Sequence, residues 1–158
     1  MKKSLIIPLA MLLAVTPAFA RWELDDDSDD QGFLFIASQI DTTDTVEIQV
    51  ACDEFMAGDI LFSIFTGVDP GKSKDSSPPV PVTVAFGSVV HADLDGTVVD
   101  IEGERILDIS EADEPAVRQI AEAIRKGKEM TVSYLDVSWT VPPDAATEAL
   151  PGIFDRCP

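Results

Sequence analysis

The sequence predicts an α+β domain: an antiparallel β-sheet or small β-sandwich of seven to eight strands, with two C-terminal helices. Up to Ile109, short segments rich in β-branched residues alternate with turn residues, which is typical of antiparallel strands. After Ser110 the apolar residues recur at helical spacing. Because no internal repeat or long linker divides the 158 residues, we expect a single domain over residues 21–158 behind a leader of residues 1–20.

The leader has the three parts of a secretory signal peptide. A basic pair, Lys2-Lys3, precedes the apolar run 5–15, and small residues follow at Ala18 and Ala20. We therefore predict cleavage after Ala20, which gives a periplasmic or secreted protein that begins at Arg21. The apolar run is too short for a permanent anchor, and no later segment is long enough to span a bilayer. The alternative is a buried N-terminal helix.

Cys52 and Cys157 are the only cysteines, so only one pairing is possible. Export makes a structural disulfide the expected state, and it would tie the C-terminus to the middle of the chain across about 105 residues. The alternative, a redox-active pair, lacks the C-x-x-C spacing.

Four strands are expected in the first part of the chain, each bounded by turn residues. In the third of them Val46, Ile48 and Val50 alternate with polar residues, the pattern of a half-buried strand. The acidic run DDDSDD at 25–30 is expected to form a solvated turn. The four expected strands are 21–24, 32–37, 46–52 and 60–66.

Residues 68–79 (VDPGKSKDSSPP) are expected to form a loop. The segment 80–90 follows as one long strand with Val82, Val84 and Phe86 on one face. Asp95-Gly96 predicts a hairpin turn before a returning strand. That strand is expected at 97–101, and a second turn at 102–104 leads to another at 106–109.

The chain then changes to helical periodicity. Ser110 is a good N-cap, and Gly127 is a good C-terminal cap, so a helix is expected over 113–126. One long strand at 130–141, bulged near Asp136, is expected next. A second helix begins at Pro142-Pro143 and is expected to be interrupted at Pro151-Gly152.

Acidic residues dominate the chain, with 29 Asp and Glu against 11 Lys and Arg and a net charge of −18. Without the two leader lysines, nine basic residues remain and the net charge becomes −20. Such a surface repels phosphate, which excludes non-specific binding to nucleic acid or to an anionic membrane as the main activity. The acids serve either hydration at high ionic strength or attraction of a basic partner.

One segment, from His91 to Glu102, matches part of a calcium-binding EF-hand loop. With Gly96 as the sixth position, Asp93, Asp95 and Glu102 occupy ligand positions. His91 is a poor first ligand for a hard cation, however, and the flanking segments are β-rich, so a hairpin explains the same residues without a metal. The run 25–30 could also bind Ca²⁺ or Mg²⁺, but its carboxylates do not have the spacing of a known metal-binding motif. We therefore expect no resident metal or cofactor.

No catalytic residue can be assigned. His91 is the only histidine, and Ser88 at three residues from it would not share its side of a strand. No G-x-S-x-G motif is present, and carboxylate pairs are too abundant to be informative. Trp22, Tyr134 and Trp139 could line a ligand surface, but aromatic residues in strands are more often core.

The layout of the chain resembles small exported, disulfide-bonded proteins of Gram-negative bacteria, among them the type VI secretion-associated VasI-like proteins. The similarity lies in Trp22 near the mature start, the strand that ends at Cys52, the helix with Gly127 after it, and the ending 139–157 (WTVPPDAATEALPGIFDRC). The resemblance implies an exported, disulfide-closed, β-rich domain without enzyme activity and a possible place beside a secretion system.

Three functions follow as hypotheses. The first is a non-enzymatic accessory protein that binds another exported or envelope protein. The second is an acidic inhibitor of a basic hydrolase such as lysozyme, because opposite charges would speed their encounter. The third is a small hydrolase that uses carboxylates.

Overall fold

The computed structural model describes residues 21–30, 32–54, 59–66, 80–101, 104–109 and 114–158. Within these ranges the chain forms one nine-stranded sheet and two helices, so the predicted α+β class is confirmed and the predicted seven to eight strands are too few. The strands are β1 (Glu23–Asp26), β2 (Leu34–Ile40), β3 (Glu47–Asp53), β4 (Ile60–Phe65), β5 (Val80–Phe86), β6 (Val89–Ile101), β7 (Glu104–Ile109), β8 (Met130–Tyr134) and β9 (Val137–Val141). The helices are α1 (Glu114–Arg125) and α2 (Ala146–Arg156).

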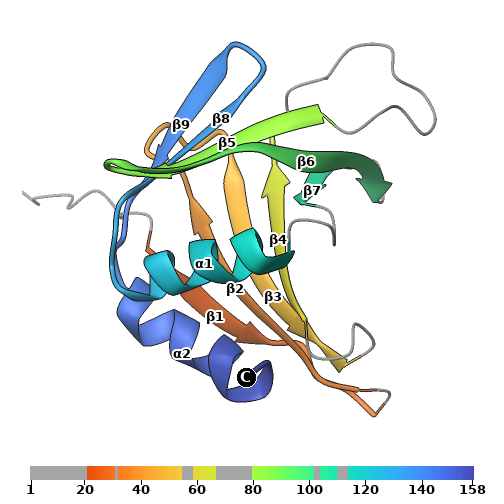
Figure 1. Ribbon diagram of the computed structural model, residues 1–158. Coiled ribbons are helices and arrows are strands. Elements are labelled where there is room, and N and C mark those ends of the chain that lie inside the picture. The colour runs from red at the N-terminus through yellow and green to blue at the C-terminus, as the bar shows by residue number, and fades with distance from the viewer. Residues whose placement is uncertain (1–20, 31, 55–58, 67–79, 102–103, 110–113) are drawn as a thin grey trace, which may run out of the picture.

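The strands are antiparallel throughout and follow the order β1-β2-β3-β4-β7-β6-β5-β8-β9. The sheet curves into a half-barrel, and both helices lie against its concave side (Figure 1). Helix α1 packs against β4 and α2, whereas α2 packs against β1, β2 and β3.

Alternating burial explains why the strands pair in this register. In β3 the residues Ile48, Val50 and Cys52 are fully buried, and the residues between them are only half-buried. The same period of two buries Val82, Val84 and Phe86 of β5, as the sequence predicts. A shift of one residue in any of these pairings would turn the apolar side chains away from the core, so the pattern fixes the register.

Two turns that the sequence analysis missed, and one that it wrongly predicted, account for the difference in strand number. The segment 80–90 is not one strand, because a turn at Gly87-Ser88 separates β5 from β6. Gly87 has a φ of 61° and an open space where a Cβ would lie, which suits a tight turn. Likewise 130–141 is split at Leu135-Asp136, where Leu135 has a φ of 53°. Gly87-Ser88 is a pair found in two-residue hairpin turns, so a signal was present there, whereas Leu135 is not a typical turn residue.

The predicted hairpin turn at Asp95-Gly96 is wrong, because both residues lie inside β6. There Gly96 pairs with Val80 on one side and with Ile109 on the other. A Cβ on Gly96 would lie 2.7 Å from Leu107 Cδ1 and 2.9 Å from Val82 Cγ2. The glycine therefore serves the close approach of neighbouring side chains, not a turn.

Both helices differ slightly from expectation. Helix α1 runs over Glu114–Arg125, and Gly127 follows with a φ of 69° as the predicted C-terminal cap. The predicted N-cap Ser110 lies outside the described residues. Helix α2 continues through Pro151 instead of being interrupted there. Its Gly152 leaves room for the side chain of Leu24 from β1.

Hydrogen bonds connect the two ends of the strand order. The backbone N–H of Thr42, after β2, donates to the carbonyl oxygen of Thr140 in β9 at 3.0 Å. The backbone N–H of Trp22 donates to the carbonyl oxygen of Asp144 at 2.8 Å, and its indole N–H donates to that of Pro142 at 3.2 Å. The fully buried Trp22 thus holds the start of the described chain against the segment that joins β9 to α2.

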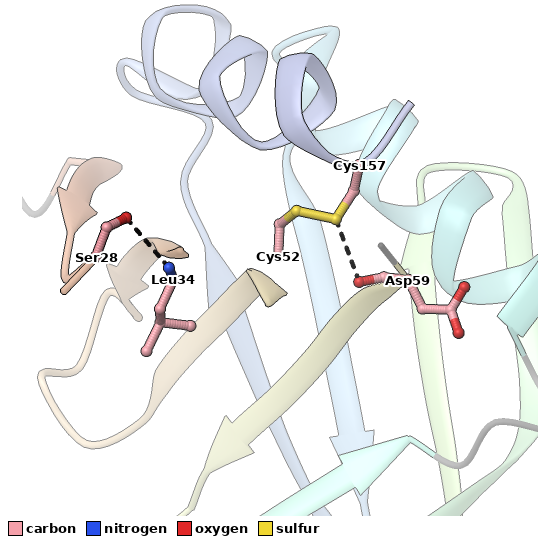
Figure 2. The surroundings of a disulfide bond; sticks show 5 residues. All are labelled: Ser28, Leu34, Cys52, Asp59 and Cys157. Atoms are coloured by element: carbon pink, nitrogen blue, oxygen red, sulfur yellow. Dashed lines mark hydrogen bonds between the residues drawn. A yellow bond between two sulfur atoms is a disulfide. The ribbon is translucent and has the colours of Figure 1, made fainter. Parts of the chain in front are cut away.

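Cys52 and Cys157 form the predicted pair, joined in a disulfide with their Cα atoms 6.0 Å apart. Figure 2 shows that the bridge links the end of β3 to the C-terminal end of α2. Both cysteines are completely buried. The Sγ of Cys157 also lies 3.5 Å from the carbonyl oxygen of Asp59. This contact is not a hydrogen bond, because a sulfur atom in a disulfide carries no hydrogen.

Asp41 organises the turn between β2 and β3. Its carboxylate is buried and accepts hydrogen bonds from the backbone N–H groups of Thr43 (2.9 Å), Thr45 (2.8 Å) and Val46 (2.9 Å) and from the Thr43 hydroxyl. Burial alone would raise the pKa of Asp41, but these hydrogen bonds outweigh it and hold the pKa below the usual value. The carboxylate is therefore a buried cap for three backbone donors.

Replacing Gly96 tests its place inside β6. Gly96→Ala should lower the free energy of unfolding by about 1–3 kcal/mol, because the added methyl group overlaps packed side chains. Thr97→Ala, at an exposed position of the same strand, is the control and should cost less than about 1 kcal/mol. Urea unfolding measures both. A neutral Gly96→Ala would contradict the close packing at this glycine.

Replacing Asp41 tests the buried cap. Asp41→Asn should destabilise the fold by about 1–3 kcal/mol at neutral pH, because an amide cannot accept all of these bonds. A lowered folded-state pKa means that the stabilisation is complete above the unfolded pKa of about 4 and is lost as the pH falls through the folded value. The gap between the two proteins should therefore close in acid. Urea unfolding across this range measures it, with the exposed Asp44→Asn as control. A gap that stays constant with pH would refute the role of the charge.

Candidate functional site

A hollow of about 350 Å³ lies between the outer side of α1 and the turn that joins β5 to β6. It is the candidate site because polar, charged and apolar side chains converge on it from three parts of the chain. Helix α1 and the residues after it supply most of the wall, and β5 and β6 supply the rest. The lining residues are Phe86, Val89, His91, Arg118, Gln119, Glu122, Ala123, Lys126 and Lys128.

Positive charge is concentrated at this hollow although the chain as a whole is strongly acidic. Half of the basic side chains that the structure describes line it. Three cationic side chains face one carboxylate here, which leaves two positive charges even when His91 is neutral. The six described basic side chains are Arg21, Arg118, Arg125, Lys126, Lys128 and Arg156, of which Arg118, Lys126 and Lys128 line the hollow.

Glu122 is the only carboxylate among the lining residues, and it is already engaged. Its Oε2 lies 2.8 Å from Arg125 Nη2 and 3.6 Å from Lys126 Nζ. The hydrogen bond from Arg125, stronger in effect than the opposing burial, lowers the pKa of Glu122, so this side chain stays ionised. Arg125 in turn stacks over the ring of Phe154, 4.6 Å from its centre. The pair Glu122–Arg125 is therefore largely satisfied within the helix.

The apolar part of the hollow comes from the β5–β6 turn. Phe86 is almost fully buried, whereas Val89 beside it is 49% exposed. Val89 therefore forms an apolar rim next to the cations, so the hollow offers both charge and apolar surface to an occupant.

His91 belongs to this hollow and is half-buried on β6. The charged residues that line the hollow with it are Arg118, Glu122, Lys126 and Lys128. Ser88 lies in the preceding turn and is not among the lining residues. An imidazole in this place could donate a hydrogen bond to an anion. The arrangement can hold an anionic group and does not build a nucleophile–base pair among the lining residues.

The structure contradicts the interpretation of residues 91–102 as an EF-hand calcium loop. An EF-hand needs a helix on each side of its loop, and here β6 runs as a strand from Val89 to Ile101. Asp93 and Asp95 are exposed on β6, and Asp93 has a φ of 55° where β6 carries one residue more than β5. Glu102 lies outside the described residues. Among the residues with described positions, no group of three His, Cys, Asp or Glu is placed to hold a metal ion.

The acidic run 25–30 is exposed, as predicted, but its first two residues belong to β1. The Asp26 carboxylate accepts the backbone N–H of Ser28 at 3.1 Å, and that of Asp29 accepts the N–H of Gly32 at 3.3 Å. Hydrogen bonds from Ser28 lower the pKa of Asp26. These carboxylates shape the β1–β2 turn, and the loop predicted at 68–79 lies outside the described residues.

Trp22, Tyr134 and Trp139 do not form a ligand surface. Their side chains are at most 6% exposed and belong to the core. The alternative that these aromatic residues belong to the core is therefore confirmed.

The hollow is the feature that sequence reasoning missed. A signal was present: Arg118, Glu122 and Lys126 follow one another at intervals of four, which places them on one face of a helix. The contribution of Phe86, Val89 and His91 depends on the unpredicted turn at Gly87-Ser88, although Gly-Ser between two β-rich runs is also a hairpin signal.

Comparison with models of protein families, with curated proteins and with solved structures finds no match to this chain. The resemblance to exported VasI-like proteins therefore stays a prediction. Within the described part of the chain, neither helix is long and apolar enough to cross a membrane.

Proposed function

We propose that this chain is an exported, non-enzymatic accessory protein that binds another exported or envelope protein. The leader 1–20 directs export, cleavage after Ala20 releases the protein, and it acts in the periplasm or outside the cell. One structural feature supports this setting: the Cys52–Cys157 disulfide suits an oxidising compartment.

The observation that carries the proposal is the hollow beside α1. A cation-lined depression with an exposed apolar rim is the kind of surface that a specific partner covers, because it combines steering charge with area to bury. A place beside a secretion system is the narrower form of this proposal, and the identity of the partner decides it.

A second candidate function is inhibition of a basic hydrolase. It is favoured by β1, an edge strand whose four residues are all exposed, and by the turn after it. Six of the eight residues from Glu23 to Asp30 are acidic. An edge strand can also add a partner's strand through its main chain, so charge and pairing would act together on a basic enzyme.

Capture from periplasmic extract tests the proposal. The protein, purified from the periplasm of an exporting host with its bridge oxidised, should retain one partner in stoichiometric amount at low salt. High salt should weaken the association without abolishing it, because the apolar rim is not screened. Mass spectrometry identifies the partner and also shows whether the bait begins at Arg21.

The same experiment separates the two candidates. A basic hydrolase that is inhibited, that is released by high salt and that no longer binds Asp25→Asn/Asp27→Asn/Asp30→Asn would establish the inhibitor instead. The absence of any stoichiometric partner at either salt concentration would refute both functions.

A further inference from the structure

We propose that the hollow takes a short acidic segment of the partner protein, with a carboxylate between the cations and a neighbouring apolar side chain on Phe86 and Val89. The inference rests on the proposed binding function and deepens it, since it names the surface used and the chemistry recognised.

Charge placement is the first argument. An approaching carboxylate meets three cations that line the hollow: Arg118 on α1, and Lys126 and Lys128 just after it. Opposite charges at close range near a protein surface attract by several times the value in bulk water. Glu122 weakens this field but does not cancel it, because Arg125 adds a further positive charge 2.8 Å from its carboxylate.

The acidity of the remaining surface favours a short segment over an extended polyanion. Nucleic acid or an anionic membrane would bring many negative charges against a chain of net charge −18. A few residues of peptide can enter the hollow and leave the rest of the partner outside the repulsive field, which salt screens beyond about 8–10 Å.

The dimensions fit such a segment. At about 1.5 Å of rise per residue, Arg118 lies about 10 Å before Arg125, the last residue of α1, and Lys126 follows directly, at about 12 Å. An extended peptide covers that length with about four residues at about 3.3 Å each. The volume of about 350 Å³ suits one or two buried side chains.

The macrodipole of α1 gives a competing explanation for some of these cations. Lysines near a helix C-terminus stabilise the exposed carbonyl groups, which accounts for Lys126 and Lys128. It does not account for Arg118, which is the fifth residue of α1 and lies about two turns before its end. Nor does it account for the exposed Val89 on a different element that lines the same hollow.

Amide chemical shifts test the inference directly. The ¹⁵N-labelled exported protein is titrated with acetyl-Glu-Leu-Glu-Leu-Glu-amide, with the same peptide carrying Gln in place of Glu, and with inorganic phosphate. The acidic peptide should shift resonances of α1, of Lys128 and of the β5–β6 turn. The glutamine peptide should bind about tenfold more weakly or worse, because it lacks the charge-assisted hydrogen bonds.

Two double variants test whether the acidic peptide binds in the hollow. Arg118→Gln/Lys128→Gln should weaken the acidic peptide by about tenfold or more. Arg21→Gln/Arg156→Gln removes the same charge elsewhere and should leave binding within about twofold. Arg21 pairs with Glu148, and Arg156 lies over the ring of Phe35, so neither lines the hollow. The dispersed amide spectrum of each variant shows whether it is folded.

Several results would overturn the inference. They are shifts outside the hollow, equal binding of the glutamine peptide, equal response to phosphate, no response to any probe, or equal weakening by both double variants. Its failure is separable from that of the proposed function. If Arg118→Gln/Lys128→Gln still captures the wild-type partner, the binding function stands and the hollow is not the surface used.

Discussion

The concave side of the sheet is apolar, and within the described chain two helices of 12 and 11 residues cover it. Helix α2 packs against β1, β2 and β3. The Cys52–Cys157 bridge joins the end of this helix to β3 across 105 residues and so opposes fraying of its last turn. Chain-entropy models assign such a closure about 4–5 kcal/mol. Because α1 packs against α2 and β4, the position of α1 depends on the same bond.

The candidate site also depends on the Cys52–Cys157 disulfide. Its cations stand on α1 and just after it, whereas its apolar rim stands on the β5–β6 turn, so the hollow exists only while helix and sheet keep their places. The inner face of α1 is anchored by Val117, Ile120 and Ile124, which are buried. Arg118 and Glu122 thereby lie on the face of α1 that lines the hollow. One amphipathic helix thus supplies the core on one face and the charged wall on the other.

Strong local patterns predicted much of the fold. Alternation in β3 and β5 and helical spacing with Gly127 gave the right elements, and export chemistry gave the cysteine pair. Errors arose where tertiary packing overrides local signals: Gly96 serves packing inside β6, and Leu135 accepts a positive φ in a turn. The candidate site was missed because three of its nine lining residues depend on the turn at Gly87-Ser88, a hairpin pair that lies inside a long apolar run.

Site-specific photo-cross-linking in the exporting cell tests the central claim most directly. A photoreactive amino acid replaces Val89 at the rim of the hollow, or Leu135, which is similarly exposed but lies in the β8–β9 turn. We predict a covalent adduct with one exported or envelope protein from position 89 and none from position 135. An adduct from position 135 alone, or none from either position, would contradict the assignment of the hollow as the binding surface.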